Sequence, residues 1–488
     1  MNLSKENLSS IGSAVIKPAD AIFSLPEKVL QFGTGVLLRG LPDYFIDKAN
    51  RQGLFNGRIV VVKSTDSGDA GAFDRQDGLY TLCVRGIEDG HKVEENIICS
   101  AISRVLSARD QWQDILALAR NPEMQIVISN TTEVGIQLVE DDIRRQPPAS
   151  FPGKLLAFLY ERYKAFGGSP ESGMVIVPTE LIVDNGKKLA AIVKELTQMN
   201  ALEADFLLWM ETHCHFCSSL VDRIVPGKPD AASLQQLTHD LGYTDDLLSI
   251  SEVYRLWAIE GDEKVKTILS FAAADEGVVI EPDIEIYREL KLRLLNGTHT
   301  LSCGLAYLAG FGTVKQAMDN AAFSAFVADL MLKEIAPAIP YEVSLGAARD
   351  FGLRVLDRFR NPHLQHQWLS ITMQYSSKMK SRDIPVLLRH YQKHSTPPPH
   401  FALGFAAYLL FMKGGSHPVN DDKASYFAEL WQSPATVVNA ALKDKSLWGA
   451  DLTALPGFEE AVKNNLDSLI NKGTAATIAG AAERPLVR

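Results

Sequence analysis

Residues 289–300 (ELKLRLLNGTHT) bring three chemically useful side chains close together: Lys291, Asn296 and His299. In a straight α-helix, at 100° per residue, Asn296 lies about 140° and His299 about 80° round from Lys291, so the three share one side. Lys291 and His299 are then about 12 Å apart along the axis, a span that an extended polyol or sugar acid bridges. Gly297 weakens the helix and lets a ligand come close.

This set suits hydride transfer between an alcohol and a ketone. Desolvation lowers the pKa of a buried lysine, so Lys291 can act as an acid or base near neutral pH. The Asn296 amide can donate to a developing alkoxide, and His299 can hold a neighbouring hydroxyl. A solvated basic face that ends at an Asn-Gly pair accounts for the same spacing, so both interpretations remain open at this point.

Residues 30–40 (LQFGTGVLLRG) form a second feature, a strand followed by the Gly33-Thr34-Gly35 turn and a helix start. In a dinucleotide-binding fold the first glycine permits the tight turn and the second lets the pyrophosphate approach the backbone. Leu38 stands where the third glycine of the usual motif belongs, and Arg39 can add a charge to the phosphate site. An ordinary strand-to-helix turn has the same form.

The acid that binds the ribose hydroxyls in such folds follows the second strand. Here the second predicted strand ends in Lys63-Ser64-Thr65-Asp66, and Asp66 is the acid closest to it. Lys63 and Ser64 suit a ribose phosphate equally well. The residues by themselves therefore leave NAD and NADP both open.

Residues 213–217 (HCHFC) carry metal-type side chains, with His213 and Cys217 at i, i+4 spacing. Zinc sites usually draw their ligands from two separated pairs, and the sequence shows no second pair. We therefore expect a buried helix with small thiols and no metal site.

The elements that must position these residues fall into two halves. Apolar, β-branched strands alternate with amphipathic helices in the first half, which predicts a mostly parallel sheet with crossover helices. The expected strands are 27–32, 58–63, 125–128 and 173–178, with helices 37–50, 110–120 and 186–199 and an inserted strand 77–84. Helices alone are expected later, at 286–308, 317–335, 341–358, 402–412 and 426–430. We predict an α/β domain over residues 1–285 and an all-α domain over 286–488.

Composition narrows the class of protein. The chain has 488 residues, 46% of them hydrophobic and 22% charged, with a net charge of -10. An acidic chain does not offer the basic face that nucleic acid requires. The longest apolar run, 401–412, is too short to cross a bilayer, and residues 1–20 do not resemble a secretory signal. With five scattered cysteines, these features predict a cytoplasmic protein without disulfides or membrane partners; they predict no particular oligomeric state.

Taken with Gly33-x-Gly35, the Lys291, Asn296 and His299 segment resembles the mannitol dehydrogenase family of long-chain, metal-independent polyol dehydrogenases. The likeness runs from about residue 29 to about residue 422. Four further motifs carry it, namely 76–80 (QDGLY), 129–136 (SNTTEVGI), 219–227 (SLVDRIVPG) and 256–261 (LWAIEG).

The resemblance implies a Rossmann-type N-terminal domain, an all-α C-terminal domain and an active-site cleft between them. The SNTTEVGI and PTELIVDNG segments are most similar to members that act on ketouronates. They imply NAD-linked interconversion of D-tagaturonate and D-altronate. The alternatives are fructuronate reduction, mannitol-type polyol oxidation, or dinucleotide binding without catalysis.

The resemblance also assigns roles to residues. Lys291 matches the catalytic lysine, Asn296 the oxyanion donor and His299 the substrate-holding histidine. The implied cofactor contacts are Gly33, Thr34, Gly35, Arg39, Asp66, Thr131 and Glu133, and the implied substrate contacts are Lys378, Arg382 and Asn185. Lys378 and Arg382 lie in a basic cluster suited to a substrate carboxylate, although such runs are often simply solvated. One departure is Leu181, which stands where mannitol dehydrogenases carry a second oxyanion-site asparagine.

Overall fold

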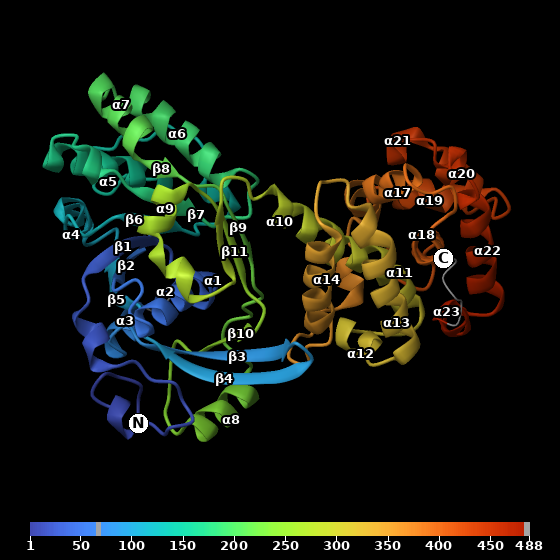
Figure 1. The fold of residues 1–488 in the computed structure, drawn as a ribbon, viewed down its shortest axis with the longest axis horizontal. Coiled ribbons are helices and arrows are strands. Elements are labelled where there is room, and N and C mark those ends of the chain that lie inside the picture. The colour runs from blue at the N-terminus through green and yellow to red at the C-terminus, as the bar shows by residue number, and fades with distance from the viewer. Residues whose placement is uncertain (65–69, 483–488) are drawn as a thin grey trace. The chain divides into compact units, whose positions relative to one another are not determined.

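A computed structural model describes residues 1–64 and 70–482 of the chain. These residues form two compact units (Figure 1). The first unit comprises residues 1–85 and 92–284, and the second comprises residues 86–91 and 285–488. Asp66, the predicted ribose-binding acid, lies outside the described residues.

The first unit contains a six-stranded sheet whose paired strands are all parallel. Its order is β5-β2-β1-β6-β7-β8, which is the 3-2-1-4-5-6 order of the Rossmann fold when these six strands are numbered along the chain. The strands are β1 (Glu27–Phe32), β2 (Arg58–Lys63), β5 (Ile102–Ser107), β6 (Ile126–Ser129), β7 (Val175–Pro178) and β8 (His215–Phe216). The predicted parallel α/β fold is confirmed.

Both faces of this sheet are buried, which explains why its strands are continuous apolar runs rather than alternating ones. Successive side chains point to opposite faces. Val29 joins a core with Phe45 and Trp257, whereas its neighbour Leu30 joins a second core with Phe158. The sheet therefore holds its strand ends rigidly between two packed layers.

Helices and two small sheets complete the first unit (Figure 1). Its α-helices are α1 (Val36–Gly40), α2 (Pro42–Arg51), α3 (Ala70–Arg75), α4 (Trp112–Ala117), α5 (Phe151–Phe166), α6 (Asn185–Met199), α7 (Ala204–His213), α8 (Ala231–Leu241) and α9 (Glu263–Ile268). One small sheet joins β10 (Ser249–Glu252), β3 (Tyr80–Glu88) and β4 (His91–Cys99). The other joins β12 (Val278–Glu281), β11 (Leu256–Glu260) and β9 (Ser219–Asp222).

The helix predicted over residues 37–50 is in fact two helices, α1 and α2. Leu41 separates them with φ -135° and ψ -78°, and Pro42 opens α2. Proline has no N–H and its ring clashes with the preceding turn, so it begins a helix more readily than it continues one. The break gives the segment after the glycine turn a direction of its own.

Asp43, in α2, is fully buried behind the glycine turn. Gln31 lies between the two, and its Nε2 donates to Asp43 Oδ2 at 3.3 Å and to the Gly33 carbonyl at 3.4 Å. Burial raises the pKa of Asp43 to about 8. The folded protein therefore keeps this proton over a range of pH in which an unfolded chain, with a pKa of about 3.9, has released it.

We expect Asp43 to make the protein less stable as pH rises from about 4 to about 8, because only the unfolded state gains a charge in that window. Asp43→Asn should remove this slope in the free energy of unfolding against pH. The change that it removes is on the order of a few kcal/mol between about pH 5 and pH 8. Urea midpoints at the two pH values measure it. Asp205→Asn, at an exposed position of the same unit, is the control and should keep the wild-type slope. An unchanged slope in Asp43→Asn would show that Asp43 is ionised in the folded state.

Apart from the tip of the β3–β4 hairpin, the described residues of the second unit form helices and no strand (Figure 1). They are α10 (Glu285–Leu290), η7 (Lys291–Gly297), α11 (Thr298–Leu308), α12 (Val314–Met318), α13 (Ala321–Asp329), η8 (Leu330–Ile335), η9 (Ala336–Ala338), α14 (Leu345–Phe359), α15 (Trp368–Ile371), α16 (Tyr375–Lys378), η10 (Met379–Asp383), α17 (Ile384–Tyr391), α18 (Pro399–Met412), α19 (Ala424–Leu430), α20 (Val437–Lys443), α21 (Lys445–Trp448), η11 (Leu452–Ala454), α22 (Phe458–Asn471) and α23 (Thr474–Ala482).

Two predicted helices of this unit begin or break elsewhere, each at a capping residue. The helix expected over 317–335 is interrupted before α13, where the Asn320 side chain accepts a hydrogen bond from the Phe323 amide. The helix expected from residue 341 begins as α14 after Ser344, which caps the Ala347 amide. Each cap accepts a hydrogen bond from a backbone N–H in the first turn of its helix, where no preceding turn supplies an acceptor.

Helix α18 contains the longest apolar run and is buried on nearly all sides. It packs against α11 and α22, so its all-round hydrophobicity reflects a central place in the unit. Within residues 1–64 and 70–482, no helix is long and apolar enough to cross a membrane.

Candidate active site

The glycine turn follows β1 at the centre of the six-stranded sheet. Gly33 has φ of +125°, and a Cβ there would lie 2.8 Å from the Asn130 carbonyl oxygen, in the loop after β6. A Cβ on Gly35 would meet nothing within 4 Å. β1 and β6 are the neighbours at which the strand order reverses, and Rossmann folds bind dinucleotides there. A tight turn with open space at its second glycine fits a pyrophosphate.

Alanine at these two glycines should have different effects. Gly35 has φ of -63°, so Gly35→Ala should fold normally and raise the Kd for NADH about tenfold, because the methyl group occupies the pyrophosphate position. Gly33→Ala should lower the melting temperature, since its φ and its contact with Asn130 exclude a side chain. Fluorescence titration and thermal melts measure the two effects, with Gly12→Ala as the control. Unchanged NADH affinity in Gly35→Ala would place the pyrophosphate elsewhere.

The loop after β6 is held by a buried carboxyl that the sequence did not identify as functional. Glu180 Oε1 accepts from the Thr131 amide at 2.9 Å and from Thr131 Oγ1 at 3.0 Å, and Oε2 accepts from Ser129 Oγ at 3.1 Å. Burial raises the pKa of Glu180. Thr132, which follows Thr131 in this loop, has φ of 86°, an uncommon conformation for a β-branched residue. Glu180 therefore fixes the shape of the loop.

Thr131 and Glu133 were predicted to contact the cofactor. Thr131 lies in the loop at the reversal point, where its hydroxyl already donates to Glu180. Glu133 begins the 3₁₀ turn Glu133–Gly135, and its side chain lies outside the described part of the chain. Thr34, between the two glycines, is half-buried.

Arg39 does not extend toward the glycine turn as predicted. Its side chain is buried, donates to the Leu247 carbonyl, and lies 5.5 Å from the ring centre of Tyr80 and 5.8 Å from that of Phe73. These contacts tie α1 to the inserted strand β3. They make Arg39 a packing residue, because its charge is already turned inward.

Asn185 was predicted to contact substrate, whereas the structure engages its side-chain amide in hydrogen bonds within the protein. Its Nδ2 donates to the carbonyls of Pro178, Glu180 and Ser219, and its Oδ1 accepts from the amides of Gly186 and Ser219. A side-chain amide has no further capacity. Asn185 therefore joins the ends of β7 and β9. Leu181, in the same loop, is 65% exposed.

In the second unit, Lys291 and Asn296 lie in the π-helical segment η7. The straight α-helix assumed from the sequence is therefore wrong here. A π-helix bonds residue i to residue i+5, so Asn296 takes the place on the next turn that residue i+4 takes in an α-helix. By this register Asn296 lies closer to Lys291 around the helix axis than the 140° of a straight α-helix. Single π turns are frequent at functional sites.

His299 follows at the start of α11 and is 8% exposed. Its ring stacks on Phe359, with centres 4.1 Å apart, and meets the ring of His366 edge-on at 5.1 Å. Burial, and then His366, Arg358 and Arg382, hold the pKa of His299 well below its usual range. His299 Nε2 is buried and has no hydrogen-bond partner among the described residues. A neutral imidazole with an unused nitrogen suits a substrate hydroxyl.

A second π-helical segment, η10, crosses η7, and each holds the other through an arginine. Arg293 Nη1 donates to the carbonyls of Ser381 and Arg382, both at 2.7 Å. Arg382 Nη1 donates back to the Asn296 carbonyl at 3.5 Å and to Thr300 Oγ1 at 3.1 Å. The predicted substrate residue Arg382 is thus brought to the predicted catalytic segment. This crossing stabilises the wide turns that display Lys291 and Asn296.

Basic side chains gather around His299. Lys378 is half-buried and donates to the Ile371 carbonyl at 3.0 Å, and burial followed by Arg382 lowers its pKa. Burial, then Arg358, then Lys378 lower the pKa of His366. The sequence did not identify Arg358 and His366, because neither lies in a motif. We call Arg358, Lys378 and Arg382 the cationic group. His366 adjoins it, and its lowered pKa keeps the ring neutral near neutral pH.

Asp383 is a buried acid next to this group. It is fully buried against Gly297, where a Cβ would lie 2.7 Å from its Oδ1, and neither carboxyl oxygen has a hydrogen-bond partner within the described chain. Burial raises the pKa of Asp383 well above its usual range, against the opposing effect of Arg382 and Arg293. Burial therefore disfavours a negative charge on Asp383 beside the cationic group.

The metal-type residues at 213–217 do not form the expected helix, because α7 ends at His213 and β8 spans His215–Phe216. Cys214 and Cys217 are free and buried, and burial raises the pKa of each thiol to about 12. Across residues 1–64 and 70–482, no group of three or more His, Cys, Asp or Glu side chains is placed to hold a metal ion.

Two family models match this chain, one over each of its two parts. The Mannitol dehydrogenase Rossmann domain matches residues 27–271, and the Mannitol dehydrogenase C-terminal domain matches residues 283–470. The altronate oxidoreductase of Bacillus subtilis (strain 168) is 39% identical over 455 residues, which cover 92% of this chain and 94% of that protein. The altronate oxidoreductase of Yersinia enterocolitica is 37% identical over 93% of this chain and 97% of its own length.

Solved structures share the fold. Mannitol 2-dehydrogenase of Pseudomonas fluorescens, in a ternary complex with NAD and D-mannitol, aligns with a TM-score of 0.65 at 24% identity, covering 99% of this chain and 100% of that one. D-sorbitol dehydrogenase in substrate-free form aligns with a TM-score of 0.76 at 20% identity, covering 98% and 100%. With a Rossmann sheet, a helical second unit and both family models matched, this chain belongs to the mannitol dehydrogenase family.

Proposed function

We propose that the protein is an NAD(H)-dependent, metal-independent oxidoreductase that interconverts D-tagaturonate and D-altronate. The observation that carries the proposal is the cationic group beside Lys291, Asn296 and His299 within one unit, since a neutral polyol has no use for these charges. Two altronate oxidoreductases more than a third identical over nearly the whole chain support it. We assign cofactor binding to residues 1–285 and substrate binding to residues 286–488.

The reaction needs a proton and a stabilised oxyanion as well as a hydride. NADH, when bound at the Gly33–Gly35 turn, supplies the hydride to the ketone carbon. Lys291 gives its proton to the ketone oxygen, or takes it back in the oxidation direction. Asn296 donates its amide N–H to the same oxygen as negative charge develops there. His299 offers Nε2 to a neighbouring hydroxyl and so fixes the carbon chain.

The substrate carboxylate is assigned to the cationic group. Lys378 and Arg382 stand one turn apart, and the ring of His366 meets that of buried His299 edge-on. Partly desolvated lysine and arginine bind a carboxylate more strongly than solvated ones do. Because Arg382 also holds the Asn296 carbonyl, we expect Lys378 to turn toward the substrate and exchange its hydrogen bond to the Ile371 carbonyl for one to the carboxylate.

Absorbance of reduced nicotinamide tests the proposal. Purified protein is given tagaturonate, fructuronate or fructose with NADH and then NADPH, before and after chelation. We expect rapid, chelator-resistant oxidation of NADH with tagaturonate. Preference for fructuronate or fructose would overturn the substrate assignment, loss of activity in chelator would overturn metal independence, and no turnover would favour dinucleotide binding without catalysis.

We also propose a cytoplasmic location. All five cysteines are buried and free, which suits a reducing compartment.

A further inference from the structure

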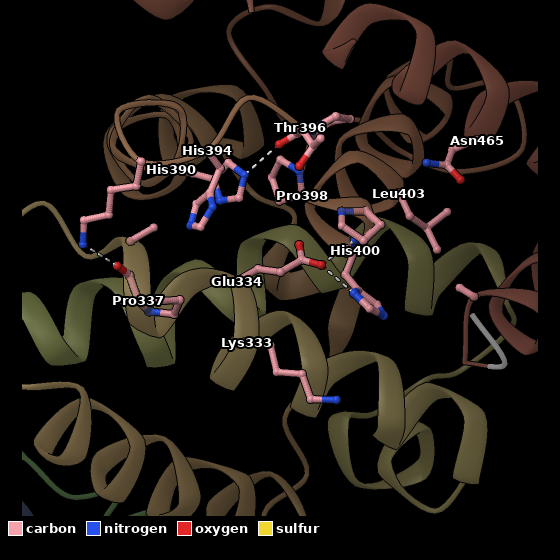
Figure 2. A pocket seen from close by; sticks show the side chains of 15 residues that line it. Lys333, Glu334, Pro337, His390, His394, Thr396, Pro398, His400, Leu403 and Asn465 are labelled. Atoms are coloured by element: carbon pink, nitrogen blue, oxygen red, sulfur yellow. Dashed lines mark hydrogen bonds and ion pairs between the residues drawn. The ribbon is translucent and has the colours of Figure 1, made fainter. Parts of the chain in front are cut away.

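A cavity of about 430 Å³ lies in the second unit and shares no lining residue with the candidate active site (Figure 2). It is bounded by η8 and η9, by the end of α17 with the loop that follows, and by the start of α18. Its volume falls within the range of small-molecule sites. Three of its lining residues are histidines, namely His390, His394 and His400, and we call it the histidine pocket.

The one acidic side chain that lines the histidine pocket already has its partners. Glu334 Oε1 accepts from the His400 amide at 2.9 Å and from His400 Nδ1 at 2.6 Å (Figure 2). Its Oε2 accepts from the Phe401 amide at 2.8 Å. The pair is almost fully buried. Glu334 thus caps the first turn of α18, and its charge is offset by the helix N-terminus and the imidazole.

The basic side chains have fewer partners. Lys393 Nζ donates to the Pro337 carbonyl at 3.1 Å, and no carboxylate in the described part of the chain pairs with it. His390 Nε2 lies 2.9 Å from the Thr396 carbonyl, so this nitrogen carries the proton and donates it. The His390 and His394 rings lie 4.7 Å apart, face to face at a tilt of 32°. Lys333, the other lysine, is paired with Asp329 at 2.8 Å.

Apolar groups form the rest of the lining, mainly Pro337, Ala338, the Pro397–Pro399 run and Leu403. A pocket lined by both basic and apolar side chains matches a ligand that has a charged group and an apolar part. We propose that the histidine pocket is a second binding site, which takes a small organic carboxylate with an apolar ring or chain. The carboxylate contacts Lys393, His390 and His394, and the apolar body lies against the prolines and Leu403.

Binding at this site should be coupled to proton uptake. Burial lowers the pKa of His390, so this ring is neutral near neutral pH. A bound anion favours its imidazolium form. The other titratable groups that face it are His394, Lys393, Lys333, Glu334 and His400. Glu334 is held by His400 and α18, which leaves His390 to take up the proton.

Calorimetric titration of the full-length protein with benzoate tests the proposal. Benzamide is the uncharged match in shape, and acetate is a carboxylate without an apolar body. We expect benzoate to bind at least about tenfold more tightly than either, and more tightly at pH 6 than at pH 8. Equal binding of benzamide would overturn the anion assignment, and equal binding of acetate would overturn the apolar one. Absence of benzoate binding would overturn the site itself.

Variants locate the bound carboxylate. Lys393→Gln and His394→Ala should each weaken benzoate binding about tenfold while leaving NADH oxidation at the wild-type rate, which shows that they are folded. Lys463→Gln, at an exposed position on α22, is the matched control. Lys378→Glu should leave benzoate binding unchanged. If this variant lost benzoate binding, the probe would be bound at the cationic group and the proposal would be overturned. Unchanged benzoate binding in Lys393→Gln and His394→Ala would also overturn the proposal.

Discussion

Replacing Lys291 with alanine is expected to lower kcat for tagaturonate reduction by about 10²–10⁴-fold, the usual contribution of a positioned acid or base. The change removes the proton donor but leaves Asn296 and His299 in place. NADH affinity should not change, because the glycine turn belongs to the other unit. Steady-state assays with reduced nicotinamide and an NADH titration measure the two quantities.

Chemical rescue separates this role of Lys291 from a structural one. A small amine such as methylamine should restore part of the activity of Lys291→Ala, since it can supply the missing proton from the space left by the side chain. Lys443→Ala, at an exposed lysine of the same unit, is the control and should be fully active. If Lys291→Ala kept activity within about threefold of wild type, a general-acid role would be excluded.

Reversing the charge at Lys378 is expected to lower kcat/KM for tagaturonate by about 10²–10³-fold, because a glutamate would repel the substrate carboxylate in a partly desolvated site. A ketose without a carboxylate, such as fructose, should lose less than about threefold if it is turned over at all. The ratio of the two losses is therefore the informative quantity. It is measured with both substrates at saturating NADH.

The chain offers a close control for this prediction. Lys380 lies two residues further along, is exposed, and donates to the Ser446 carbonyl at 3.2 Å. Lys380→Glu makes the same change in net charge and should leave both substrates unaffected. Equal losses for tagaturonate and fructose in Lys378→Glu would indicate a disturbed η10 segment, and no loss for either would move the carboxylate site away from Lys378.

Local patterns predicted much of the fold. The β-branched runs that became β1, β2, β6 and β7 are recognisable because a strand buried on both faces must be apolar throughout. Boundaries failed where a single residue interrupts the period, as at Leu41–Pro42 and Asn320. A proline or a cap acts through backbone hydrogen bonds, which periodicity does not register.

The candidate site was predicted in part. Lys291, Asn296 and His299 were found because they sit together in the chain, and the structure places them in one wide turn and the helix that follows. Their mutual orientation was wrong, since the spacing was read on an α-helix. Arg39 and Asn185 were given ligand roles although their hydrogen bonds lie within the protein. Arg358, His366 and Glu180 went unnoticed, because their partners are remote in sequence.

The sequence by itself determined the two-part architecture, the glycine turn and the Lys-Asn-His segment. Each of these is a property of neighbouring residues: strand and helix periodicity, a φ that requires glycine, and short spacing between polar groups. The tertiary structure alone decided which side chains face inward and which carry charge. Arg293 and Arg382 join the two π-helical segments by hydrogen bonds, and burial makes His299 neutral and disfavours a charge on Asp383. Desolvation and long-range hydrogen bonds depend on contacts between distant segments, and a linear pattern does not contain them.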